Sequence, residues 1–188
     1  MALGKGSAAR KAKVAPRAHD ALALLAAGHE EIEGLSHEFQ RRRRAIGDLE
    51  KGKLALRMCR ALDLQAALRR EVFYPAARAV LDDDDSELVD RLLIEQDVAD
   101  RLVMKVRNMP ADGQAFDATV MVLAEQAGRS MKKEEEELFP LLRHSGLDLQ
   151  GVGERMAARR TQLTTAPADR RTIRRARRVL SPGRARAR

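Results

Sequence analysis

The chain has 188 residues, of which 44% are hydrophobic, 34% are charged and 3% are aromatic. This length and composition fit one globular domain with additional segments at its ends, and the abundance of Ala, Leu, Arg and Glu favours helices over strands. The single cysteine, Cys59, excludes an internal disulfide framework and a zinc cluster built on cysteines within one chain. A lone cysteine fits a reducing compartment, so we expect a cytoplasmic protein.

The N-terminal segment is cationic but has no apolar stretch of the kind found in signal peptides. No stretch approaches the roughly 20 apolar residues that a transmembrane helix needs. We therefore expect neither a secretory leader nor a transmembrane segment.

The net charge of +8 is distributed unevenly along the chain. Residues 1–17 carry five cations and no acid, and residues 164–188 carry nine arginines and one aspartate. The two ends therefore hold +13 together, which leaves −5 on residues 18–163. Any affinity for nucleic acid or anionic lipid is expected to come from the ends, because the body of the chain is acidic.

Apolar residues at three- and four-residue steps predict the first helix, from Leu22 to Phe39, ending near the cationic run 41–44. A turn flanked by Gly47 and Gly52 should follow.

The second predicted helix has its apolar stripe from Leu54 to Val72 and stops before the acidic run 82–85. This run lacks the spaced ligands and the glycine of a calcium loop. We interpret it as the cap of the third helix, whose stripe runs from Leu88 to Val106.

Pro110 and Gly113 should end the third helix, and the fourth has its stripe from Val120 to Leu141. Because the connections are short, consecutive helices should be antiparallel. The predicted fold is all-α: an antiparallel up-down-up-down four-helix bundle over residues 18–145, with a short additional C-terminal helix at 146–163. The expected basic tails are residues 1–17 and 164–188, the latter either disordered or an amphipathic helix.

A weak internal repeat relates the second and fourth helices. Residues Gln65 and Arg69 precede Pro75 by ten and six positions, and Ser130 and Glu134 precede Pro140 by the same steps. The segments "EVFYPAAR" and "EELFPLLR" end the two units. Each helix therefore presents an inward pair at i and i+4, which lie on one helical face.

At these segments the sequence resembles the hemerythrin-like HHE cation-binding family. The resemblance covers about residues 18–163 and rests on "DALALLAAGHEEIEGL", "ALRREVFYPAAR", "EEEELFPLLRHSGLDL" and "VGERMAARR". It implies a four-helix bundle that in typical members holds two iron ions. Their ligands in such members are a His on the first and third helices and a His-x-x-x-Glu pair on the second and fourth.

Most of these ligands are replaced here, so the chain resembles a degenerate member of that family. The family's ligand positions correspond to His29, Gln65, Arg69, Gln96, Ser130 and Glu134. Only His29 and Glu134 keep ligand chemistry, because amides and hydroxyls bind iron poorly and a guanidinium stays protonated. We expect no metal, no other cofactor and no catalytic residue.

A buried Glu134 without iron would need another cationic partner. Arg69 could supply it through two parallel hydrogen bonds. We therefore predict a buried polar cluster in place of the metal, made of Arg69, Glu134, His29, Gln65 and Gln96. In the alternatives, Arg69 points outward along its helix, or His29 joins a rebuilt mononuclear metal site with help from Glu30, Glu33, Glu95 or Glu135.

The C-terminal segment places Ile173, Ala176 and Leu180 on one side if it is helical, with arginines around them. Candidate contacts with nucleic acid or another anionic surface are Arg170, Arg171, Arg174, Arg175, Arg177 and Arg178. No aromatic residue is present there to stack on bases. The segment could instead be a solubilising tail or fold onto the acidic body.

The leading functional hypothesis is a non-catalytic bundle without diiron or dioxygen binding, serving a structural, regulatory or partner-binding role with an unidentified protein partner. The alternatives are a nucleic-acid-associated protein that uses its arginine-rich tail, and a protein that keeps residual cation binding at a rebuilt site.

Overall fold

The computed structural model describes residues 20–165, which form helices and no strand. The prediction of an all-α fold is therefore confirmed for this part of the chain. Its elements are α1 (Ala21–Arg42), α2 (Asp48–Leu68), η1 (Arg69–Phe73), α3 (Tyr74–Arg78), α4 (Asp83–Asn108), α5 (Phe116–Lys133), η2 (Glu134–Leu138), α6 (Phe139–His144) and α7 (Leu149–Thr165).

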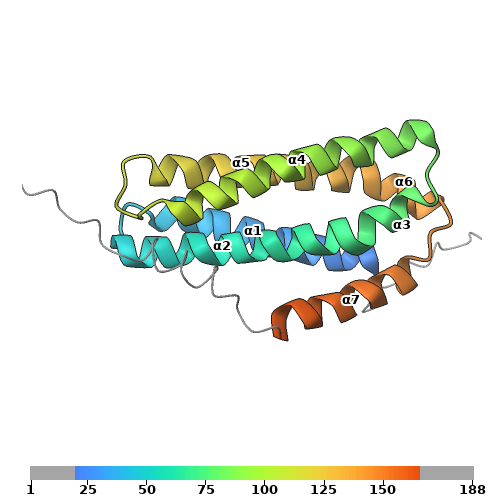
Figure 1. Ribbon diagram of the computed structural model, residues 1–188, viewed down its shortest axis with the longest axis horizontal. Helices are drawn as coiled ribbons and strands as arrows, with labels where there is room; N and C mark the ends of the chain where they lie inside the picture. The colour runs from blue at the N-terminus through green and yellow to red at the C-terminus, as the bar shows by residue number, and fades with distance from the viewer. Residues whose placement is uncertain (1–19, 166–188) are drawn as a thin grey trace, which may run out of the picture.

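The long helices lie lengthwise beside one another, with α7 crossing outside them (Figure 1). Helix α1 contacts α2 and α5, and α4 contacts the same two helices. Helix α7 packs on α1, α2 and η1. No helix among residues 20–165 has the combined length and apolarity that crossing a bilayer requires.

Most helix boundaries follow the sequence signals. Asp20 caps α1 by accepting hydrogen bonds from the backbone N–H groups of Leu22 and Ala23. The acidic run before α4 acts as the predicted cap, since the Asp82 carboxylate accepts from the backbone N–H of Asp85 at 2.9 Å.

Two boundaries differ from the prediction. Gly52 is not at a turn but buried inside α2, which begins at Asp48 because Gly47 already serves as its N-cap. Helix α7 begins at Leu149 and not at residue 146, since Gly146 turns the chain with a φ of 77°. It continues to Thr165, two residues beyond its expected end at 163.

Both segments of the internal repeat contain a π-helical turn that the sequence analysis did not predict. The turns η1 and η2 begin at Arg69 and Glu134, at equivalent points of the repeat. Pro75 and Pro140 follow as the second residues of α3 and α6, and neither can donate the next helical hydrogen bond. The wider turn and the proline thus change the helix geometry at the two residues predicted to face each other.

The hydrophobic core is divided into two clusters. One lies around Phe39, Met58 and Phe116, and the other around Phe73 and Phe139. Along α1, for example, Leu25 belongs to the second cluster and Ile32 to the first, with His29 between them. On the other helices Gln65, Gln96 and Glu134 likewise lie between residues of the two clusters.

Candidate functional site

A buried polar layer separates the two apolar clusters. Its side chains come from α1, α2, η1, α4 and η2. All five are buried, with at most 7% of each residue exposed: His29, Gln65, Arg69, Gln96 and Glu134. The apolar surroundings leave these groups dependent on one another, because water cannot solvate them.

Arg69 and Glu134 form the central ion pair of the layer. The Nη2 atom of Arg69 lies 2.9 Å from Oε2 of Glu134. The two residues are 5% and 1% exposed, so the pair is almost fully removed from water. The outward-pointing alternative for Arg69 is therefore wrong, since its guanidinium faces the interior. The two parallel hydrogen bonds expected of the pair are not formed, because Arg69 Nε and Glu134 Oε2 have no hydrogen-bond partner among the described residues and the contact is a single ion pair.

His29 contacts both members of this pair. Its Nε2 atom lies 2.8 Å from Arg69 Nη2 and 3.1 Å from Glu134 Oε2. Its other ring nitrogen, Nδ1, lies 2.5 Å from Oε1 of Glu135. Nδ1 can donate to Glu135, and Nε2 can either accept from Arg69 or donate to Glu134, depending on which ring nitrogens carry protons.

Tyr74 completes the contacts of the buried carboxylate. Its hydroxyl donates to Oε1 of Glu134 at 2.6 Å. In the internal repeat Tyr74 corresponds to Phe139, whose ring stacks on His29 with centroids 6.0 Å apart. The two equivalent aromatic positions thus serve the same layer differently, one by hydrogen bonding and the other by packing.

The electrostatics of the layer favour an ionised Glu134. Burial alone raises the pKa of its carboxyl group, but the Arg69 guanidinium and the contacts from His29 and Tyr74 outweigh this, so the pKa is lowered. The pKa of the Tyr74 hydroxyl is raised by burial and by the neighbouring carboxylate. Tyr74 therefore remains a hydrogen-bond donor across the physiological range.

Gln96 joins the layer through weaker contacts. Its Oε1 atom accepts from Arg69 Nη1 at 3.4 Å, while its Nε2 atom donates to Asp100 at 3.1 Å. The amide thereby connects the buried guanidinium to the surface of α4, where Asp100 also pairs with Arg70.

Gln65 is buried beside the layer but makes no hydrogen bond to Arg69 or Glu134. Its Oε1 atom has no hydrogen-bond partner among the described residues. The amide lies against the backbone of Gly28. A Cβ atom added to Gly28 would stand 1.6 Å from Gln65 Nε2. Gly28 is therefore required for this side-chain position, because a larger residue would displace the amide.

Ser130 makes no hydrogen bond to the central pair but belongs to a second polar group at the edge of the layer. Its hydroxyl donates to Glu95 at 2.5 Å, and Lys133 pairs with the same carboxylate. Burial raises the pKa of Glu95, but Lys133 and Ser130 lower it by more, so that this carboxylate is also held ionised. A cavity of about 20 Å³, the size of one water molecule, lies between Glu95 and the central pair.

The residues of the layer do not fit a diiron centre. No group of three or more His, Cys, Asp or Glu side chains within residues 20–165 is arranged to hold a metal ion. The guanidinium of Arg69 lies against the two remaining ligand-type residues, His29 and Glu134. A cation entering there would meet a fixed positive charge, and the amides would replace imidazole poorly.

Tyr74 and Glu135 are the site residues that the sequence analysis did not assign to the cluster. Tyr74 is the only tyrosine of the chain, and it is equivalent to Phe139 in the internal repeat. The additional hydroxyl at position 74 is the signal in the sequence that this side chain has a polar partner. The sequence indicates Glu135 only as a possible ligand of a rebuilt metal site. It follows Glu134 in an acidic run, and nothing in the spacing distinguishes it from its exposed neighbours.

The arginines from Arg170 to Arg178, predicted as contacts with anionic surfaces, lie outside the described residues. Comparison with protein-family models, with curated proteins and with solved structures gave no match.

Proposed function

We propose that this protein is a hemerythrin-like, antiparallel four-helix bundle in which a salt-bridged polar layer has replaced the metal centre. It has no diiron or dioxygen chemistry and is not an enzyme. Its role is structural, regulatory or partner-binding.

The observation that carries this proposal is the 2.9 Å contact between Arg69 and Glu134. Under the resemblance, both residues stand at positions where typical members have a metal-binding carboxylate. A permanent cation at one such position supplies the charge that the other carboxylate would otherwise take from iron. The pair therefore replaces a metal-mediated link between η1 and η2 with a direct one.

The surrounding contacts extend this link to the other helices. His29 brings α1 to the pair, and Gln96 brings α4 to it. Breaking a buried pair leaves an uncompensated charge, whereas the intact network fixes which residues face one another. The polar layer thus sets the register of the helices between two apolar clusters that could otherwise slide.

Elemental analysis and a visible absorption spectrum of the purified protein test the proposal. We expect iron well below one equivalent per chain and no oxo-bridged iron absorption, including after anaerobic incubation with ferrous iron. Two iron ions per chain with that absorption would overturn it.

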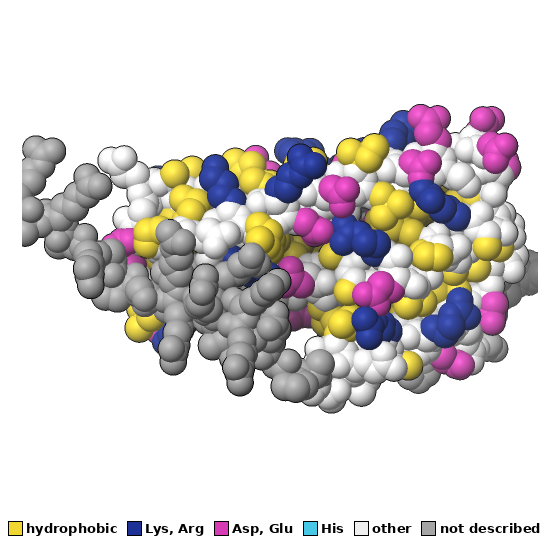
Figure 2. All heavy atoms as spheres, viewed as in Figure 1, with side chains coloured by type: hydrophobic (Ala, Val, Ile, Leu, Met, Phe, Trp, Pro, Cys, Tyr) yellow, Lys and Arg dark blue, Asp and Glu magenta, His cyan; other side chains and the backbone are white. Residues whose placement is uncertain are grey.

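A second candidate function is non-specific association with nucleic acid through the C-terminal arginines. It is favoured by the charge distribution, because the ends of the chain carry +13 and the body carries −5. On the face of the body drawn in Figure 2, Lys and Arg side chains are interspersed with Asp and Glu side chains. A protein of this kind would bind through its tail alone.

Duplex DNA binding by the full chain and by a chain without residues 166–188 tests this candidate. We expect binding that lacks sequence preference, weakens steeply with salt and disappears with the deletion. The truncation point preserves α7, which ends at Thr165. Equal affinity of the two proteins at the same salt would exclude the tail as the binding element.

A further inference from the structure

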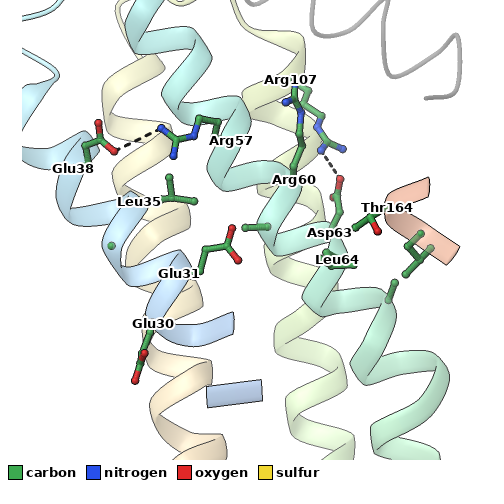
Figure 3. Close-up of a pocket in the computed structure, with 14 residues that line it drawn as sticks. Glu30, Glu31, Leu35, Glu38, Arg57, Arg60, Asp63, Leu64, Arg107 and Thr164 are labelled. Carbon is green, nitrogen blue, oxygen red and sulfur yellow. Dashed lines mark hydrogen bonds and ion pairs between the residues drawn. The ribbon is translucent and has the colours of Figure 1, made fainter. Parts of the chain in front are cut away.

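Helix α7 covers only part of the surface formed by α1 and α2. It packs on both helices and ends at Thr165, and a groove of about 780 Å³ lies along α1 and α2 beside its last residues, Leu163 and Thr164 (Figure 3). The chain that follows α7 therefore begins at this groove.

The groove has an apolar floor and an acidic edge. Leu35, Ala61 and Leu64 contribute to the floor. Glu30 and Glu31 stand on the α1 side, and Figure 3 shows Glu31 reaching from α1 toward α2. This combination suits a segment that presents apolar residues on one face and cations beside them.

The carboxylates of the α1 edge are not all neutralised. Glu38 pairs with Arg42 and lies 3.8 Å from Arg57. Glu30 and Glu31, by contrast, have no ion-pair partner among residues 20–165.

The opposite edge carries cations of its own. Arg107 is bound to Asp63, and Arg60 also lines the groove. The unpaired carboxylates of the lining therefore lie on the α1 side of the groove, whereas Arg60 and the Arg107–Asp63 pair lie on the opposite side.

We propose that the groove holds the chain's own C-terminal segment, with Ile173, Ala176 and Leu180 on the apolar floor and the neighbouring arginines against Glu30 and Glu31. The spacing of the three apolar residues places them on one side of a helix. The docked segment sequesters cations that would otherwise be free to bind other anions. The inference is independent of whether the polar layer evolved from a metal site.

The lengths are compatible with this docking. Seven residues lie between Thr165 and Ile173, enough to reach about 26 Å when extended. The groove follows α1 from Glu30 to Glu38, about 12 Å along a helix, and residues 173–180 span about 10 Å as a helix. The segment can therefore enter the groove without any change in α7.

Disulfide trapping in the full chain tests the proposal. Gly34 lines the groove, and a Cβ atom added there has no other atom within 4 Å, so that Gly34→Cys should fold normally. It is combined with Ala176→Cys under mild oxidation. The matched control is Gly128→Cys with Ala176→Cys, since Gly128 has equally open space but lies on α5, which does not line the groove.

We expect the intrachain disulfide to form at least about tenfold faster with Gly34→Cys than with Gly128→Cys, because docking raises the local concentration of residue 176. Adding Glu30→Lys and Glu31→Lys should remove the difference. Cys59 can stay in place because it is fully buried, and the single variant Ala176→Cys reports any exchange with it.

Equal rates for the two cysteine pairs would overturn the proposal. Disulfide-linked dimers as the main product of Gly34→Cys with Ala176→Cys would overturn it as well, because the groove would then take the segment of a second copy. If the disulfide with residue 34 still forms faster than the disulfide with residue 128 after both charge reversals, Glu30 and Glu31 do not hold the segment in the groove.

Discussion

Arg69 and Glu134 occupy equivalent positions of two repeated segments and are paired with each other at 2.9 Å in the centre of the molecule. Each stands at the first residue of a π-helical turn, six positions before a proline. The repeat thus places the two side chains on facing elements, and their opposite charges make the meeting attractive. A symmetric pair of carboxylates at the same positions would repel without a cation between them.

The Arg69 and Glu134 pair should be strongly coupled in stability. Arg69→Leu alone leaves a buried carboxylate without its cation and should lower the free energy of unfolding by about 3–5 kcal/mol, and Glu134→Leu should have a similar effect. The double variant should lose less than either single variant, because no uncompensated charge remains. Denaturant unfolding of the four proteins measures this cycle.

Additive losses in that cycle would contradict the pairing. Arg70→Leu with Asp97→Leu is a suitable control, because this pair lies at the surface with side chains 40% and 65% exposed. Its coupling should be no more than about 1 kcal/mol.

Tyr74→Phe should destabilise the protein by about 1–3 kcal/mol, because it removes the donor to Oε1 of the ionised Glu134 while keeping the ring. Thermal and denaturant unfolding measure the loss. The same substitution in a Glu134→Leu background should have little effect, since the acceptor is then absent. Equal losses in the two backgrounds would mean that the hydroxyl contributes through some other contact.

Gly28→Ala should cost about 1–3 kcal/mol of stability, because the new methyl group would overlap the buried amide of Gln65. Gly34→Ala on the same helix is the matched control, since its Cβ meets nothing within 4 Å. That change should be neutral or stabilising by up to about 1 kcal/mol, as expected for Gly→Ala in a helix. Combining Gly28→Ala with Gln65→Ala should recover part of the loss, and a loss unchanged by Gln65→Ala would contradict the overlap.

The positions of the polar layer could be predicted from the sequence because they continue the apolar stripes of their helices. His29, Gln65, Gln96 and Glu134 each stand between apolar residues that the structure buries. The π-helical turns could not be predicted, because proline signals a missing hydrogen bond but not a wider turn before it.

The individual contacts within the layer could not be predicted from the sequence either. Ser130 has the same helical spacing as Gln65, yet its hydroxyl turns to Glu95, a residue on another helix. Glu135 is exposed over much of its side chain and still reaches Nδ1 of His29. Long polar side chains bridge helices in ways that periodicity along one helix does not encode.

The stability conferred by Glu134 should disappear in acid. Because its folded pKa is lowered, the ionised carboxylate stabilises the fold above its unfolded pKa of about 4.3, and this contribution is lost as the pH falls through the folded pKa. Glu134→Gln should therefore be much less stable than the parent at pH 7, and the gap should narrow below about pH 4. Glu137→Gln, at an exposed position of the same acidic run, should match the parent at both pH values.

The most demanding prediction is that iron binding can be created. The combined variant Gln65→His, Arg69→Glu, Gln96→His and Ser130→His would add three imidazoles and one carboxylate to His29 and Glu134. Imidazole and carboxylate are suitable iron ligands, and the backbone already supplies the i, i+4 spacing on two helices. Iron uptake under reducing conditions should rise from negligible to measurable, as followed by elemental analysis of desalted protein.

The four changes must be tested together, because Arg69 would otherwise remain as a cation beside the incoming metal. A variant that restores the three histidines but keeps Arg69 is the matched control, and it should take up far less iron. If the folded quadruple variant takes up none, the alignment of inward positions is wrong, since a one-residue shift turns a side chain by about 100° out of the layer. The alignment is least supported at Ser130, because its hydroxyl donates to Glu95 and makes no bond to Glu134.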